Sequence, residues 1–180
     1  MSVCRTTFAV LAWGAATLLA PVYAAPPITV TPRTPTHGPI EYTVRVASKS
    51  FGDVEETRTI SSGQTDDFTW KTTPPGGPVP VAEPCPGHET LALDANGAAV
   101  RQLRVRLAPI VADNGTATVQ MSVQASAPTG KTTINTGGKT LQCPRAKTLG
   151  QVVRFTMPTD GTQKTIALND GSRVTVSAKR

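Results

Sequence analysis

Apolar and polar residues alternate one for one along several segments of this chain, and this period of two restricts the fold to β-sheet. Residues 40–48 place Ile40, Tyr42, Val44 and Val46 on one side, with charged and hydroxyl residues between them. Because successive side chains of a strand point to opposite faces, the pattern predicts a strand with one buried face. No segment shows a convincing apolar spacing of an amphipathic helix.

The same alternation recurs along the chain and predicts an all-β fold. Turn pairs such as Asn96-Gly97 and Asp170-Gly171 separate the alternating segments and favour hairpins. Residues 73–87 and 126–138 are rich in proline, glycine and threonine, and we expect loops there. The expected strands are 40–48, 54–60, 66–72, 90–94, 100–110, 117–125, 151–157, 165–168 and 173–178.

Eight or nine short strands separated by turns are typical of an antiparallel sheet protein. We therefore predict a single antiparallel β-sandwich, or a partly open barrel, over residues 40–180. Five prolines in residues 25–39 predict an extended N-terminal arm before this domain.

Residues 1–24 have the organisation of a secretory signal peptide. Arg5 supplies the positive start, residues 8–20 are apolar, and Val22-Tyr23-Ala24 fits the small-residue rule for cleavage. We expect export, to the periplasm or outside the cell. No stretch of eighteen apolar residues occurs outside the N-terminus, so we expect no membrane span in the cleaved chain.

Two cysteines, Cys85 and Cys143, remain after the expected cleavage, which removes Cys4. An exported protein meets an oxidising compartment, which favours a disulfide. Both cysteines precede proline, and proline biases its predecessor toward extended backbone. We predict a Cys85–Cys143 disulfide, which would contribute roughly 3–4 kcal/mol in the chain-entropy model.

Charge is divided unevenly along the chain. Residues 25–99 contain five basic and nine acidic residues, whereas residues 100–180 contain twelve basic and three acidic residues. A basic surface attracts anionic polymers or lipid headgroups, although charged strand faces also serve solubility and protect sheet edges. Nucleic acid is disfavoured as a partner, because the basic residues lack interleaved aromatic side chains. The candidate anion-binding residues are Arg104, Arg106, Lys131, Arg145, Lys147 and Arg154.

Residues 125–132 (ASAPTGKT) match a loose phosphate-loop pattern. A working phosphate loop opens a helix, whose first N–H groups hold the phosphates. Residues 133–138 (TINTGG) are β-branched and glycine-rich, so they predict no helix. We interpret the match as chance and expect no nucleotide partner.

Other catalytic and metal motifs are weak. Cys85 and His88 resemble half of a metal site, but the chain has two histidines and a disulfide would remove the thiolate. Neighbouring carboxylates in a strand point to opposite faces, so Asp66-Asp67 is no catalytic pair by itself. We expect no metal, no other cofactor and no catalytic residue.

These observations favour an exported, non-enzymatic cell-envelope protein that acts as a binding or adaptor module through its basic C-terminal half. The expected partner is an envelope protein or an anionic envelope polymer. One alternative is a subunit of a surface or secretion assembly, held by strand pairing through residues 25–39. The other is a hydrolase with carboxylates from separate strands.

Overall fold

The computed structural model describes residues 38–180. The expected signal peptide (1–24) and all but the last two residues of the expected arm (25–39) lie outside this range. No helix within residues 38–180 is long and apolar enough to cross a membrane. Besides one short 3₁₀ turn, η1 (His88–Thr90), this part of the chain forms strands. They are β1 (Ile40–Ala47), β2 (Val54–Ile60), β3 (Asp66–Thr72), β4 (Val79–Pro80), β5 (Ala92–Leu93), β6 (Ala98–Val111), β7 (Thr116–Thr136), β8 (Lys139–Pro158), β9 (Asp160–Ala167) and β10 (Arg173–Lys179).

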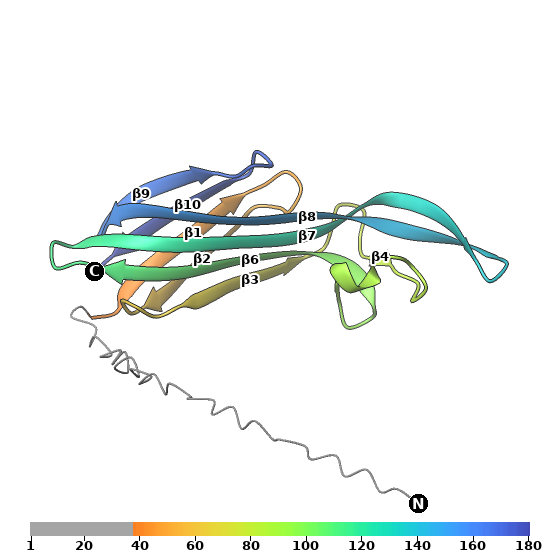
Figure 1. Cartoon of the computed structure of the whole chain (residues 1–180), viewed down its shortest axis with the longest axis horizontal. Coiled ribbons are helices and arrows are strands. Elements are labelled where there is room, and N and C mark those ends of the chain that lie inside the picture. Colours follow the sequence, from red (N-terminus) through yellow and green to blue (C-terminus); the bar gives the residue numbers. More distant parts are fainter. Residues whose placement is uncertain (1–37) are drawn as a thin grey trace, which may run out of the picture. The chain divides into compact units, whose positions relative to one another are not determined.

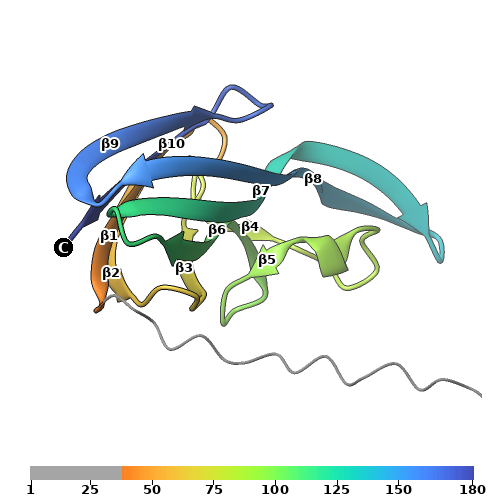
Figure 2. The ribbon, with the colours of Figure 1, turned by 60° about the vertical axis from the view of Figure 1, so that its left-hand side comes forward.

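The strands form two antiparallel sheets that pack face to face (Figure 2). Sheet A has the order β2-β1-β10-β9. Sheet B has the order β3-β6-β7-β8, and the two-residue strands β4 and β5 also pair with β6. The strands of the two sheets cross at an angle, with sheet B in front in Figure 1. The predicted all-β antiparallel sandwich is confirmed.

The core lies between the two sheets and is built by the alternation seen in the sequence. Tyr42 and Val44 of β1 and Val176 of β10 are fully buried on the inner face of sheet A. Val105 of β6 and Met121 of β7 are equally buried on the inner face of sheet B. Burying such side chains contributes about 1.5–3 kcal/mol each, so the inward positions hold the two sheets together.

Sheet A joins the two ends of the described chain. β1 pairs with β10 from Glu41, which lies opposite Lys179, to Ala47, which lies opposite Arg173. β10 therefore lies between β1 and β9, inside the sheet, although it is the last strand in sequence.

β7 and β8 are much longer than expected, with 21 and 20 residues. The loop expected at 126–138 is wrong: these residues belong to β7 and to the turn at Gly137-Gly138. Pairing of β6 with β7 ends at Ser126, so residues 128–146 form a two-stranded hairpin beyond the sandwich (Figure 1). We call this hairpin the β7–β8 extension. Gly130, at φ 55°, accommodates a register shift between Thr129 and Lys131.

The disulfide fastens the β7–β8 extension to the rest of the protein. Cys143 is bonded to Cys85, with a Cα–Cα distance of 5.5 Å, which confirms the predicted pairing. Cys143 lies opposite Thr132 in the extension, and Cys85 lies in the connection from β4 to η1. The bond therefore holds an otherwise two-stranded segment against a loop that is itself anchored on β6.

Candidate functional site

A ladder of hydroxyl and amide side chains follows β7 on the outer face of sheet B, the face turned away from sheet A. Because the residues between them are buried in the core, these side chains point outward. Eight steps of about 3.4 Å give the ladder a length of about 27 Å. Its members are Thr118, Gln120, Ser122, Gln124 and Ser126.

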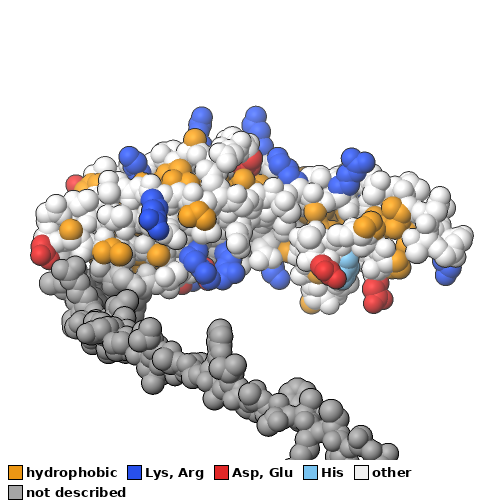
Figure 3. Space-filling view, in the orientation of Figure 1, with side chains coloured by type: hydrophobic (Ala, Val, Ile, Leu, Met, Phe, Trp, Pro, Cys, Tyr) orange, Lys and Arg blue, Asp and Glu red, His pale blue; other side chains and the backbone are white. Residues whose placement is uncertain are grey.

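Arginines flank this ladder on both neighbouring strands. Arg104 and Arg106 of β6 lie opposite Gln124 and Ser122, respectively, so they share the outer face. On β8, Arg154 lies opposite Gln120, and its Nε donates a hydrogen bond of 2.9 Å to that amide oxygen. Lys and Arg side chains outnumber Asp and Glu side chains on the face seen in Figure 3.

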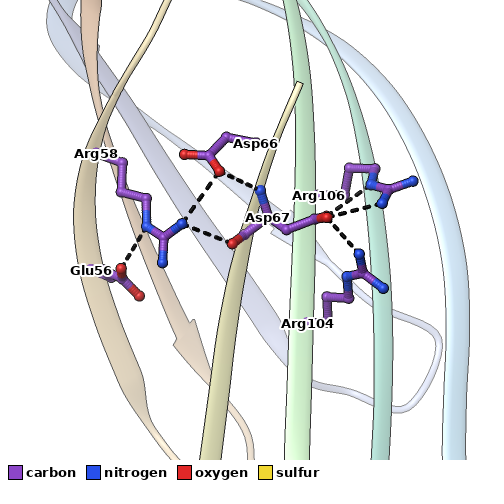
Figure 4. A network of polar contacts seen from close by, with 6 residues as sticks. All are labelled: Glu56, Arg58, Asp66, Asp67, Arg104 and Arg106. Carbon is purple, nitrogen blue, oxygen red and sulfur yellow. Dashed lines mark hydrogen bonds and ion pairs between the residues drawn. The ribbon is translucent and has the colours of Figure 1, made fainter. Parts of the chain in front are cut away.

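One carboxylate counters two of these arginines. Asp67 of β3 lies opposite Arg106, which donates from Nε and Nη2 to its two oxygens at 2.8 and 2.9 Å. Arg104 donates to Asp67 Oδ2 as well (Figure 4). Paired hydrogen bonds of this kind are stronger than neutral ones and fix the guanidinium plane. The side chains of Arg104 and Arg106 nevertheless remain 40% and 51% exposed, so solvent still reaches both cations.

The hydrogen bonds from Arg106 and Arg104 hold the pKa of Asp67 well below its usual range. The carboxylate is therefore charged at neutral pH and cancels one of the three arginine charges on this face. Arg106 in turn has a raised pKa because of its hydrogen bond to Asp67. The outer face of β3, β6, β7 and β8 keeps an excess of positive charge.

A second arginine cluster links the two sheets at their β2/β3 edge. Arg58 of β2 donates to Glu56 at 2.6 Å, to Asp66 at 3.3 Å and to the backbone oxygen of Asp67 at 3.0 Å (Figure 4). Its guanidinium also lies 5.2 Å from the ring centroid of Phe68. Arg58 thus connects sheet A to sheet B beside the candidate site.

Three shallow depressions follow one another along the ladder. The first, of about 340 Å³, includes Gln120 and Arg154, and the second, of about 80 Å³, lies between Arg104, Arg106 and two ladder residues. The third holds about 490 Å³ and includes Gln124, Ser126 and Gly150. Neighbouring depressions share the ladder as a wall, so together they mark an extended track.

The six predicted anion-binding residues divide into three places. Arg104, Arg106 and Arg154 share the outer face of sheet B, whereas Lys131 and Arg145 lie on the β7–β8 extension. Lys147 lies opposite the buried Ala127, and its Nζ donates a hydrogen bond of 2.6 Å to Ser50 Oγ in the β1–β2 connection. The structure therefore brings three of the six together.

The phosphate-loop-like segment 125–132 lies within β7. No loop or helix occurs between residues 116 and 136, so the backbone there cannot form the cradle that phosphate loops use. Lys131 is exposed on the β7–β8 extension.

Some serine and carboxylate side chains of the kind that a hydrolase uses take part in structural hydrogen bonds. Ser48 and Ser172 lie 2.7 Å apart with Asp170 2.8 Å from Ser172, but both serines are at least 94% buried. Asp94 accepts hydrogen bonds from the N–H groups of Asn96 and Ala98 in a tight turn. Among residues 38–180 no group of three or more His, Cys, Asp or Glu side chains is placed to hold a metal ion.

Comparison with known proteins places the chain in a family. The model of a family of unknown function, DUF6013, matches residues 1–180. The chain belongs to the DUF6013 family. No curated protein and no solved structure matches this DUF6013 member.

Sequence reasoning missed two parts of the site of this DUF6013 protein. The sequence shows Asp67 only as half of a carboxylate pair, because its position opposite Arg106 depends on the pairing of β3 with β6. The ladder on β7 lies within the expected strand 117–125 except for its last member, Ser126, which falls in the expected loop. The alternation of Gln and Ser across 120–126 was the signal that could have extended it.

Proposed function

We propose that this DUF6013 protein is an exported, non-enzymatic binding module that holds an anionic polymer of the cell envelope on the outer face of sheet B. The observation that carries the proposal is the ladder on β7 with Arg104, Arg106 and Arg154 on its two sides. A linear polyanion would lie along the ladder, with its charges against the arginines and its polar groups against the hydroxyls and amides.

The state of the acidic groups supports binding rather than hydrolysis. A general acid needs a carboxyl whose pKa is raised toward neutrality. Asp67 has a lowered pKa instead, and Glu56 and Asp66 both accept hydrogen bonds from Arg58. These carboxylates orient arginines.

The test is retention on heparin-agarose, with heparin as a generic polyanion. The variant Arg104→Gln/Arg154→Gln removes one cation from each side of the ladder and leaves Arg106 bonded to Asp67. The variant Lys164→Gln/Arg173→Gln removes two exposed cations from sheet A and is the control. We expect the first variant to elute at clearly lower salt than the control, because its cations face the polymer. Equal elution of the two variants would refute the proposal and leave net charge as the cause of binding.

A second candidate function is a subunit held in an assembly by strand pairing. It is favoured by β8, which ends sheet B and therefore has an outer edge without a ladder partner among the described residues. Such an edge can accept a strand from a neighbour. Light scattering after size-exclusion chromatography decides it: assemblies at micromolar concentration support this candidate, and a monomer opposes it.

A further inference from the structure

The largest of the three depressions lies where two cross-strand rows of sheet B meet the outer surface. One row is Arg104, Gln124 and Gly150, on β6, β7 and β8. The next row is Gln102, Ser126 and Thr148. Residues 89–92, from η1 to β5, close one end of the space. Its volume of about 490 Å³ is within the range of small-ligand sites.

Gly150 opens this depression. A glycine inside a strand weakens it, and such a residue usually serves a turn or a close backbone approach. Neither applies here, since Gly150 has no left-handed φ and a Cβ built on it would meet nothing within 4 Å. What the missing side chain leaves is open space beside Gln124 and Arg104.

The chemistry of the lining selects a type of ligand. Gln102 and Gln124 each offer an amide donor and an acceptor, and Ser126 and Thr148 offer hydroxyls. Arg104 adds one exposed cation, and Glu89 adds one exposed carboxylate at the η1 end of the space. A sugar ring carries several hydroxyls that both donate and accept hydrogen bonds, and an acidic sugar adds one carboxylate or sulfate. A chain of bare phosphates has the charge but no hydroxyls to match the amides.

From this geometry we infer that the depression over Gly150 is a subsite for one acidic sugar unit of a polysaccharide, with the anionic group on Arg104 and the sugar hydroxyls on Gln124, Ser126 and Thr148. The inference rests on the proposed function and names its ligand class. The rest of the polysaccharide continues along the ladder toward Arg154.

Calorimetric titration of residues 25–180 with oligomers of galacturonic acid and of heparin tests the subsite. Gly150→Trp fills the depression without a backbone clash, and Gln163→Trp places the same side chain on the exposed outer face of sheet A, away from the ladder. Gln124→Leu removes the amide at nearly constant size. For at least one of the two oligomers, we expect Gly150→Trp and Gln124→Leu each to bind at least tenfold more weakly than wild type. Gln163→Trp should bind like wild type.

The outcomes separate the two levels of the proposal. If Gly150→Trp and Gln124→Leu bind as wild type does while Arg104→Gln/Arg154→Gln loses binding, the subsite is wrong and the proposed function stands. If wild type binds neither oligomer, both are wrong. Polyphosphate of equal charge is the third titrant, and binding as tight as that of the sugars would overturn the subsite in favour of unspecific attraction. Thermal melting of each variant confirms that it is folded.

Discussion

Asp67 sets the charge of the outer face of sheet B. It receives hydrogen bonds from both Arg104 and Arg106, and so it holds these two like charges side by side. The same carboxylate competes with any anion that approaches the two guanidinium groups. Asp67 therefore has opposite effects on stability and on binding.

Asp67→Asn should strengthen polyanion binding and weaken the fold. The change frees two cations on the outer face, so we expect elution from heparin at higher salt than for wild type. It also leaves two arginines without their counter-charge, and we expect a loss of about 1 kcal/mol, since the pair is partly exposed.

Asp66→Asn is the matched control for this prediction. It changes net charge equally but on the opposite side of β3, where Asp66 bonds Arg58. An equal gain in heparin retention for the two variants would contradict the role of Asp67.

Tyr42 is a buried residue with an unsatisfied group. Its side chain is fully buried in the core, and its hydroxyl has no hydrogen-bond partner among residues 38–180. Leaving a buried polar group unpaired costs about 1–3 kcal/mol. Burial also raises the pKa of Tyr42 to about 12.

Tyr42→Phe should therefore raise the free energy of unfolding at pH 7 by about 1 kcal/mol. A raised tyrosine pKa gives stability that is complete below the unfolded value near 10 and is lost as pH rises toward 12. The variant should lack this alkaline loss. Urea unfolding at pH 7 and pH 11 measures both effects, and a destabilised variant at pH 7 would show that the hydroxyl has a partner.

The β7–β8 extension is an element that depends on a covalent bond. Residues 128–146 pair only with each other in the described structure, and an isolated two-stranded hairpin is marginal in water. The disulfide from Cys143 to Cys85 supplies the tertiary restraint that a third strand would otherwise give.

Replacing both cysteines by serine should loosen the β7–β8 extension and lower global stability by about 2–5 kcal/mol. Hydrogen exchange measures where the loss falls. The exchange rate of amides in residues 131–142 should increase most relative to wild type, and that of amides in β1 should increase less. Unchanged protection of residues 131–142 would mean that the hairpin is stable without the disulfide.

The strands of the sandwich could be predicted because each has one buried face, which requires an apolar residue at every second position. β1 and β6 show this alternation. The β7–β8 extension could not, because it has no core to face. Pro128 and Gly130 there resembled loop residues, yet a strand whose other edge is free tolerates both. Local composition was informative only where a sheet face was buried.

The candidate site was predictable to the same degree. The outward direction of Arg104 and Arg106 followed from the inward direction of the residues between them. Their partner Asp67 and their neighbour Gly150 depend on the register of three strand pairs, which no local pattern specifies.

At the scale of the whole molecule, carboxyl groups with lowered pKa make the stability of the fold depend on pH. Hydrogen bonds from Arg106 and Arg104 lower the pKa of Asp67, and hydrogen bonds from Thr162 lower that of Asp160. A carboxyl with a depressed folded pKa contributes stability that is complete above its unfolded value near 4 and is lost as pH falls toward the folded value.

Wild type should therefore lose stability progressively below pH 4. The stability difference between wild type and Asp67→Asn should shrink over the same range, because protonation removes in wild type the charge that the substitution removes at every pH. Guanidinium unfolding midpoints from pH 2 to pH 7 measure the difference. A stability difference that stays constant over this range would contradict the lowered pKa of Asp67.

The pairing of β1 with β10 also fixes an order of events. One edge of β1 pairs with β2, which follows it closely in sequence. The other edge pairs with β10, whose last paired residue is Lys179. Contacts so distant in sequence form slowly, because a long loop must close before they contribute. A growing chain therefore cannot complete sheet A until β10 has been synthesised, and β1 and β9 lack the strand between them until then. For a protein proposed to be exported, this topology delays completion of the fold.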